Sequence, residues 1–252
     1  MKKMFAGLFF SFFVAGLLQA EVLLDKTFDN ESGKVSAGGP LKRVSFVNVE
    51  AGSETIGTDP AAHFMDDSTT ESGVLEYNLG AAPAGAFFIS FDLLNNVTAA
   101  EGESKRLIFS MGPWADVNSF ILNGGAKRAF SLEFEQAASS KALSIRIGTT
   151  TIKKCSYDVK ALQQVKIWVN DNDKEKLSYV RPDNQEEAKL NPDSVVVWVN
   201  DKLVADQSAG GIAMQASMST GDAVLGRLGF SSTTASTVDF WIDNLHVESV
   251  SR

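Results

Sequence analysis

The chain has 252 residues, a formal net charge of −8 at pH 7 and a single cysteine. This acidic balance argues against nucleic acid or an anionic membrane surface as a partner, because both would repel the protein. One cysteine excludes an intramolecular disulfide, so an apolar core must stabilise the fold, and this length is sufficient for that in one domain.

The first 20 residues have the pattern of a secretory signal peptide. Lys2 and Lys3 form a short basic start, residues 4–18 carry no charge, and the small residue Ala20 ends the segment. The apolar run of about 15 residues is shorter than the roughly 20 that span a bilayer. We therefore predict cleavage after Ala20. The alternative is an uncleaved N-terminal anchor.

Cleavage would leave a mature domain of residues 21–252. Removing two lysines and no acid makes its net charge −10. The mature part has no second long apolar run, so we expect no membrane span in it. The short two-lysine signal is typical of bacterial export, which predicts a periplasmic, cell-surface or secreted location.

Hydrophobic side chains alternate with polar ones along most of the mature chain. The clearest runs are residues 80–94, 105–111, 130–134 and 143–147. A period of two is the pattern of a strand with one buried face, and residues of high β-propensity dominate these runs. Turn signals such as Gly38-Gly39-Pro40 and Asn123-Gly124-Gly125 separate them. The chain is therefore predicted to be all-β, a two-sheet antiparallel sandwich.

Two later segments share one pattern. Residues 165–171 and 195–201 both read as strands that run into an Asn-Asp pair, which predicts two sheet strands in similar environments. The second continues into residues 202–206 as a tight hairpin return. Between them, residues 172–192 are charged and contain two prolines, which predicts an exposed loop with one short strand at Leu177–Val180.

Three segments resemble domains of the concanavalin A-like lectin/glucanase superfamily, including laminin-G-like bacterial modules. They are VVVWVNDKLVAD at 195–206, TVDFWIDNLHVE at 237–248, and LLDKTFDN at 23–30. The resemblance implies a jelly roll with one convex and one concave sheet, in which the opening strand pairs beside the closing strand. It does not imply one activity, because this fold carries lectins, hydrolases, lyases and adhesion modules.

The polar sides of the middle strands predict a sugar-binding face. If the apolar residues of each run face the core, two tryptophans, two carboxylates and two bases project outward. Aromatic faces stack on pyranose rings while charged groups bond hydroxyls. If the strands are neighbours, the predicted glycan-binding residues are Trp168, Trp198, Glu133, Glu135, Arg146 and Lys166. The alternative is that both tryptophans are buried.

A carbohydrate-binding module without catalysis is thus the first functional hypothesis. A glycan-cleaving enzyme is the second, because Glu133 and Glu135 lie two apart on one strand and retaining glycosidases use paired carboxylates. However, the superfamily's endo-glucanases carry a third acid on that strand, which this chain lacks, and no lyase motif is present. A structural or adhesion protein of the cell surface is the third.

A structural Ca²⁺ is a further prediction. The resemblance implies that the first and last strands lie together and can share such an ion. Asp29, Asn30 and Asp243 supply oxygen ligands of the type that Ca²⁺ prefers. The alternative is ordinary turn chemistry. One cysteine and two distant histidines give no zinc pattern.

Overall fold

A computed structural model describes most of the mature chain. The described residues are 20–28, 33–35, 37–45, 48–56, 59–66, 70, 72–80, 85–95, 104–113, 127–137, 141–157, 161–204, 210–215, 224–233 and 238–250. The predicted signal peptide, residues 1–20, lies outside them except for its last residue. Regular structure in the described part is almost entirely strand, and it includes no helix with the length and hydropathy to cross a membrane.

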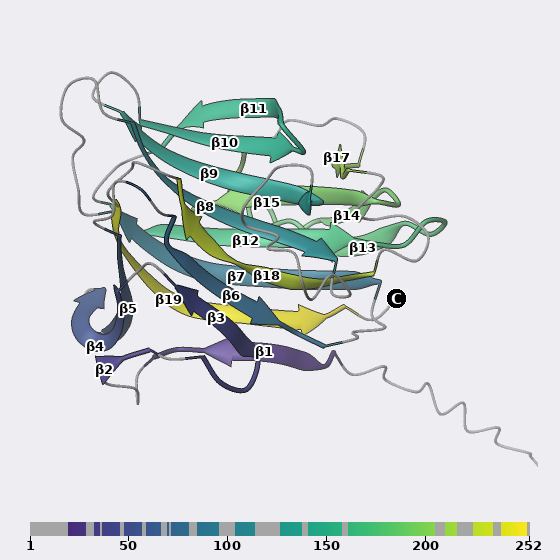
Figure 1. Cartoon of the computed structure of the whole chain (residues 1–252). Coiled ribbons are helices and arrows are strands. Elements are labelled where there is room, and N and C mark those ends of the chain that lie inside the picture. The colour runs from purple at the N-terminus through teal and green to yellow at the C-terminus, as the bar shows by residue number, and fades with distance from the viewer. Residues whose placement is uncertain are drawn as a thin grey trace, which may run out of the picture.

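Two antiparallel sheets stack face to face in the described part (Figure 1). Sheet A has the spatial order β16-β15-β12-β7-β19-β5-β4-β2, with β1 added to β19 and β17 to β15. Its strands are β1 (Val22–Lys26), β2 (Gly33–Lys34), β4 (Asn48–Ile56), β5 (Asp59–Asp66), β7 (Ala86–Asn95), β12 (Gln163–Asn170), β15 (Ser194–Val199), β16 (Lys202–Leu203), β17 (Ile212–Ala213) and β19 (Val238–Ser249).

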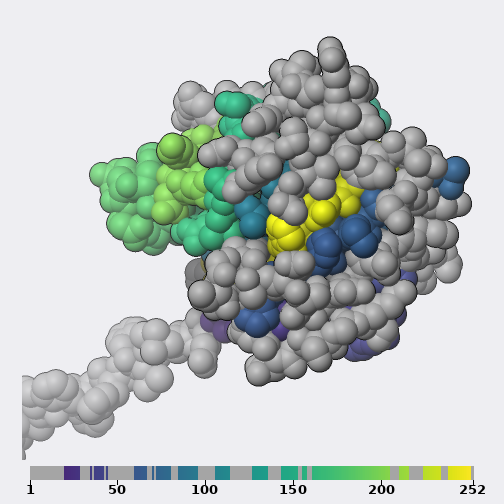
Figure 2. Space-filling view, turned by 90° about the vertical axis from the view of Figure 1, so that its left-hand side faces the viewer, coloured from purple at the N-terminus to yellow at the C-terminus, as the bar shows by residue number. Residues whose placement is uncertain are grey.

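Sheet B has the order β11-β10-β9-β8-β18-β6-β3. Its strands are β3 (Leu41–Ser45), β6 (Val74–Asn78), β8 (Ser104–Pro113), β9 (Phe130–Ala137), β10 (Lys141–Ile147), β11 (Thr150–Ser156) and β18 (Leu225–Ser232). A separate hairpin, β13 (Leu177–Val180) with β14 (Glu187–Leu190), packs on the outside of sheet A. Its green residues belong to the projection at the left of Figure 2. The sequence pattern predicts β13 but favours a loop where β14 forms.

The core lies between the sheets, where the alternating apolar residues point inward as predicted. From sheet A, Phe91 of β7 meets two rings of sheet B, at centroid distances of 5.0 Å to Phe109 and 5.2 Å to Phe230. All three are buried, and each such side chain contributes about 1.5–3 kcal/mol. The all-β, two-sheet antiparallel jelly roll predicted from the sequence is confirmed.

Two local features fix which side chains face outward. The hairpin between β15 and β16 turns at Asn200 and Asp201, whose φ angles of 50° and 57° fit the two-residue turn preferred by antiparallel strands. Strand β19 contains a bulge at Asn244, where φ is 51° and the pairing with β7 shifts register. Before the bulge Phe240 faces the core, and after it Leu245 does.

Candidate functional site

Partly exposed aromatic rings form a line across the outer face of sheet A. Trp168 of β12 lies directly opposite Phe88 of β7, with 4.8 Å between ring centroids. Tyr179 of β13 lies 5.1 Å from Trp168 on one side, and His246 of β19 lies 6.5 Å from Phe88 on the other. We name these four side chains the aromatic strip.

The strip follows from strand alternation. On β12, Val165, Ile167 and Val169 are buried in the core, so Trp168 projects to the other side. The same rule places Phe88 outward on β7. The sequence therefore already placed Phe88 outside the core, although its role was not recognised. Nothing in the sequence indicates that Tyr179 folds back against Trp168, because that contact depends on where the hairpin docks.

Trp198 lies on the same outer face, as predicted, but the hairpin β13–β14 covers it. Its side chain is 1% exposed and belongs to a second apolar cluster with Leu177, Leu190 and Val196. The guanidinium of Arg181 lies 5.6 Å from its ring centroid. A covered indole has no free face for a ligand. Trp198 instead belongs to the buried cluster against which Trp168 and Tyr179 of the strip pack.

Polar groups border the strip on several sides. Lys166 Nζ donates to Asp201 Oδ1 at 2.8 Å. The ring nitrogens of His246 lie 3.3 Å from Asp25 Oδ1 and 3.4 Å from Glu248 Oε2. Burial raises the pKa of the Tyr179 phenol, which therefore stays protonated at neutral pH. The border can both donate and accept hydrogen bonds.

The other predicted binding residues, Glu133, Glu135 and Arg146, lie on the opposite side of the molecule. They belong to β9 and β10 and project from the outer face of sheet B, which we name the charged face. The expectation that all six predicted residues share one face is therefore wrong. Strand parity shows which way each side chain points but not which sheet contains its strand.

Ion pairs fill the charged face. Arg146 Nη1 donates to Glu133 Oε1 at 2.8 Å, and Arg106 Nη2 donates to Glu135 Oε1 at 3.0 Å. Arg106 also lies 3.7 Å from Glu133. Arginines thus contact both carboxylates that a retaining glycosidase would need free, and these residues have the arrangement of a structural network.

The centre of the charged face is closed. Glu76 and Arg227 are 1% and 6% exposed and form an ion pair, with Arg227 Nε 2.7 Å from Glu76 Oε1. Ser110 and Ser131 face each other across β8 and β9, and both are buried. Among the described residues, neither hydroxyl has a hydrogen-bond partner.

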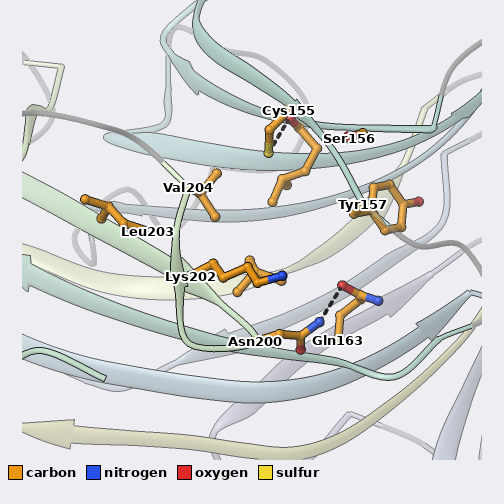
Figure 3. A pocket seen from close by; sticks show the side chains of 10 residues that line it. Cys155, Ser156, Tyr157, Gln163, Asn200, Lys202, Leu203 and Val204 are labelled. Carbon is orange, nitrogen blue, oxygen red and sulfur yellow. Dashed lines mark hydrogen bonds between the residues drawn. The ribbon is translucent and has the colours of Figure 1, made fainter. Parts of the chain in front are cut away.

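A cavity of about 340 Å³ opens where the edges of the two sheets meet, and we name it the edge pocket (Figure 3). Sheet B contributes β10 and β11, and sheet A contributes the β15–β16 hairpin. The lining residues are Leu143, Cys155, Ser156, Tyr157, Gln163, Val199, Asn200, Lys202, Leu203 and Val204. No sequence pattern indicates this pocket, because its walls come together only through the stacking of the sheets.

The predicted calcium ligands fall into two groups. Asp29 and Asn30 lie outside the described residues. Asp243 is buried at the β19 bulge, where its Oδ1 accepts the Asn244 backbone N–H at 2.7 Å. Within the described ranges, no group of three or more His, Cys, Asp and Glu side chains could hold a metal ion. Asp243 is thus engaged in the bulge itself, and the calcium site stays a prediction.

Comparison with solved structures places the fold. The carbohydrate recognition domain of Emp47p superposes with a TM-score of 0.54 at 8% identity, over 94% of this chain and 100% of that one. The catalytic domain of a glycoside hydrolase family 131 protein from Coprinopsis cinerea gives 0.54 at 11%, over 92% and 96%. The carbohydrate esterase vb_24B_21 from Shiga toxin-encoding bacteriophage phi24B gives 0.53 at 13%, over 92% and 100%.

These likenesses and the two stacked antiparallel sheets define the class, a jelly-roll sandwich. This is the fold that the resemblance of the three sequence segments implied. Neither a family model nor a curated protein sequence matches the chain. Structural likeness at such low identity shows the fold and assigns no activity.

Proposed function

We propose that this protein is an exported carbohydrate-binding module that holds a glycan against the aromatic strip. The observation that carries the proposal is the line of three partly exposed rings, Tyr179, Trp168 and Phe88, on the outer face of sheet A. The fold supports it, since two of the three neighbours reported above are named for carbohydrate recognition or carbohydrate esterase activity and the third for glycoside hydrolysis.

The chemistry of the strip suits a sugar chain. A pyranose ring has an apolar C–H face that packs on an aromatic ring, and hydroxyls around its rim that need donors and acceptors. Trp168 and its two neighbours provide the apolar surface. Lys166, Asp201 and Glu248 provide charged groups along its border. Among the described residues, the carboxylates that border the strip already contact His246 or Lys166, which favours binding over cleavage.

The site can be tested on the mature chain with a panel of soluble glycans. We expect Trp168→Ala and Tyr179→Ala each to weaken binding about tenfold or more, as removal of a central aromatic anchor does. Trp241→Ala is the matched control. Trp241 is a partly exposed tryptophan on the same outer face, but it pairs with Leu94, six residues along β7 from Phe88, or roughly 20 Å away.

Circular dichroism would confirm that each variant is folded. Equal affinity of wild type, Trp168→Ala and Tyr179→Ala for the bound glycan would refute the strip. The same incubations are assayed for new reducing ends and unsaturated uronates. Detection of either product would show that the protein cleaves glycans and would overturn the proposal of a non-catalytic binding module.

Export and calcium are separate parts of the proposal. The N-terminal sequence of the secreted product should begin at Glu21 if cleavage follows Ala20. A retained signal would instead indicate an anchored protein. Calcium should raise the melting temperature, and EDTA should lower it, if the ion joins the chain ends as predicted. Equal melting temperatures with calcium and with EDTA would rule out a structural calcium ion.

A further inference from the structure

The edge pocket opens between the edges of the two sheets, whereas the aromatic strip lies on the outer face of sheet A, although β12 contributes a residue to each, Gln163 to the pocket and Trp168 to the strip. The pocket lies between the edge strand of sheet B, β11, and the edge hairpin of sheet A, β15–β16. Its volume of about 340 Å³ falls within the roughly 300–1,000 Å³ of small-molecule sites. Nothing in the proposed glycan binding uses it.

Apolar side chains form most of the wall. Leu143 is 1% exposed, and Val204, Val199 and Tyr157 are 7–8% exposed, so all four are part of the buried interior around the cavity. Figure 3 shows Val204, Cys155 and Tyr157 around the same space. A void lined in this way forfeits dispersion contacts, and apolar cavities of this kind take up apolar molecules.

The polar groups on the floor of the pocket largely satisfy one another. Asn200 Nδ2 donates to Gln163 Oε1 at 3.1 Å, and Gln163 Nε2 donates to the Ala161 carbonyl at 2.8 Å. Asn200 Oδ1 accepts the Gln164 backbone N–H at 2.8 Å. Tyr157 accepts a hydrogen bond from Asn95, and burial raises its pKa to about 12, so it remains neutral.

Lys202 differs from these groups. Among the described residues of the lining it is the only charged side chain, and its ammonium makes no hydrogen bond or ion pair with any described residue. It is exposed, and Figure 3 shows it among the labelled side chains that line the pocket. An apolar chamber with one available cation at its mouth has the charge and polarity to hold an amphiphilic anion.

We propose that the edge pocket binds a small amphiphilic carboxylate. Its apolar body lies between Leu143, Val199 and Val204, and its carboxylate pairs with Lys202. Free fatty acids and carboxylates carried by larger molecules share this chemistry. Octanoate, which has a flexible alkyl body, and the aromatic carboxylate phenylpropionate, which has a rigid ring, serve as the two arms of the test.

Cys155 provides a built-in reporter, because it is the only cysteine in the sequence and lines the pocket. Its thiol lies 3.7 Å from the Leu143 carbonyl and is half-buried. A ligand in the pocket should therefore slow the reaction of Cys155 with a disulfide reagent such as DTNB. The proposal assigns the thiol no chemical role of its own.

The experiment measures octanoate binding to the mature chain by calorimetry and by protection of Cys155. Octanoate should bind and slow labelling, and octanol should bind more weakly. Lys202→Met should weaken octanoate about fivefold to tenfold and leave octanol unchanged, because only the carboxylate loses a partner. Lys174→Met, an exposed lysine outside the pocket, is the matched control and should change neither.

A filled pocket gives the second check. Val204→Phe places a larger side chain in the cavity and should abolish octanoate binding, and an unchanged unfolding midpoint would show that the variant is folded. Equal binding of octanoate and octanol, or full affinity in Lys202→Met, would overturn the assignment of the carboxylate to Lys202. Protection by methyl glucoside without protection by octanoate or phenylpropionate would overturn the ligand class, while leaving the aromatic strip untouched.

Discussion

The outer faces of sheets A and B carry polar and aromatic side chains in opposite arrangements. On sheet A, the rings of Trp168, Phe88 and Tyr179 stay partly exposed, with charged groups only at their border. On sheet B, charged side chains occupy the face itself, and Glu76 and Arg227 are almost completely buried. The outer face of sheet A therefore leaves apolar surface available to a ligand, whereas the charged side chains of sheet B pair with one another.

This difference separates binding from stability. Removing an exposed aromatic ring lowers the stability of the fold little, whereas leaving a buried charge without its partner is strongly unfavourable. Substitutions on the charged face should therefore act on folding. Substitutions on the aromatic strip should act on ligand affinity. Unfolding free energies and glycan affinities of single variants test that division.

Glu76→Gln should lower the free energy of unfolding by about 3–5 kcal/mol, because it leaves the buried Arg227 without its carboxylate. Urea denaturation measures the change. Glu135→Gln is the control on the same face. Its pair with Arg106, whose side chain is 34% exposed, should contribute about 1 kcal/mol or less. Similar losses in both variants would contradict the view that burial decides the effect.

Trp198→Ala should cost about 3 kcal/mol, because the indole is the centre of the cluster beneath the hairpin β13–β14. Trp168→Ala removes a ring that is already partly in solvent and should cost about half as much. The two residues lie on adjacent strands of one face, so they make a matched pair for thermal unfolding. A larger loss for Trp168 would show that the strip is a structural cluster.

Asp171 should produce a pH effect that belongs to neither face. Its Oδ2 accepts the Leu225 backbone N–H at 2.9 Å, which joins the end of β12 in sheet A to β18 in sheet B. Burial, as the main cause, raises its pKa from 3.8 to about 7. The folded state therefore holds this proton more tightly than the unfolded state, so the stability it contributes below pH 4 is lost as the pH rises to about 7.

Asp171→Asn keeps an acceptor for Leu225 and removes the titration. At pH 8 the variant should be about 2 kcal/mol more stable than the wild type, and the advantage should shrink toward pH 4. Urea midpoints at several pH values measure it. A constant difference across this range would show that the raised pKa of Asp171 does not couple to folding.

The smallest effect is expected at Lys166. Its pair with Asp201 is partly exposed, at 34% and 51% of the two side chains, so Lys166→Met should change stability by less than about 1 kcal/mol. Glycan affinity should fall more visibly, because the ammonium borders the strip. Calorimetric titration against Trp168→Ala would rank the two contributions. An unchanged affinity would remove Lys166 from the site.

Strand parity made much of the fold predictable from the sequence. The inward residues of β7, β8, β9 and β10 were assigned correctly, because a half-buried strand must alternate. The pairing of β1 with β19 and the hairpin after Val199 were also predicted, and the register confirms both. Strands β12 and β15 are neighbours in one sheet, but their environments differ, because Trp168 is partly exposed and Trp198 is buried beneath the hairpin β13–β14.

Properties that depend on distant contacts could not be predicted. Parity placed Glu133 and Trp168 on outward faces but could not show that these faces point in opposite directions. The burial of Trp198 depends on a hairpin that offers only two buried leucines, Leu177 and Leu190, as a sequence signal. The edge pocket forms because the edge of sheet B at β10–β11 and the edge of sheet A at β15–β16, which are far apart in sequence, leave a space between them.

The bulge at Asn244 has a consequence for comparing this protein with others. Because it adds one residue to β19, the even-numbered Phe240 and Ile242 and the odd-numbered Leu245 and Val247 all face inward. In a relative that lacks one residue at this position, the side chains after it would switch faces, so that those pointing into the core would point to solvent and the reverse. Where an alignment places a gap in this strand therefore determines whether His246 is matched to a surface residue or to an interior one.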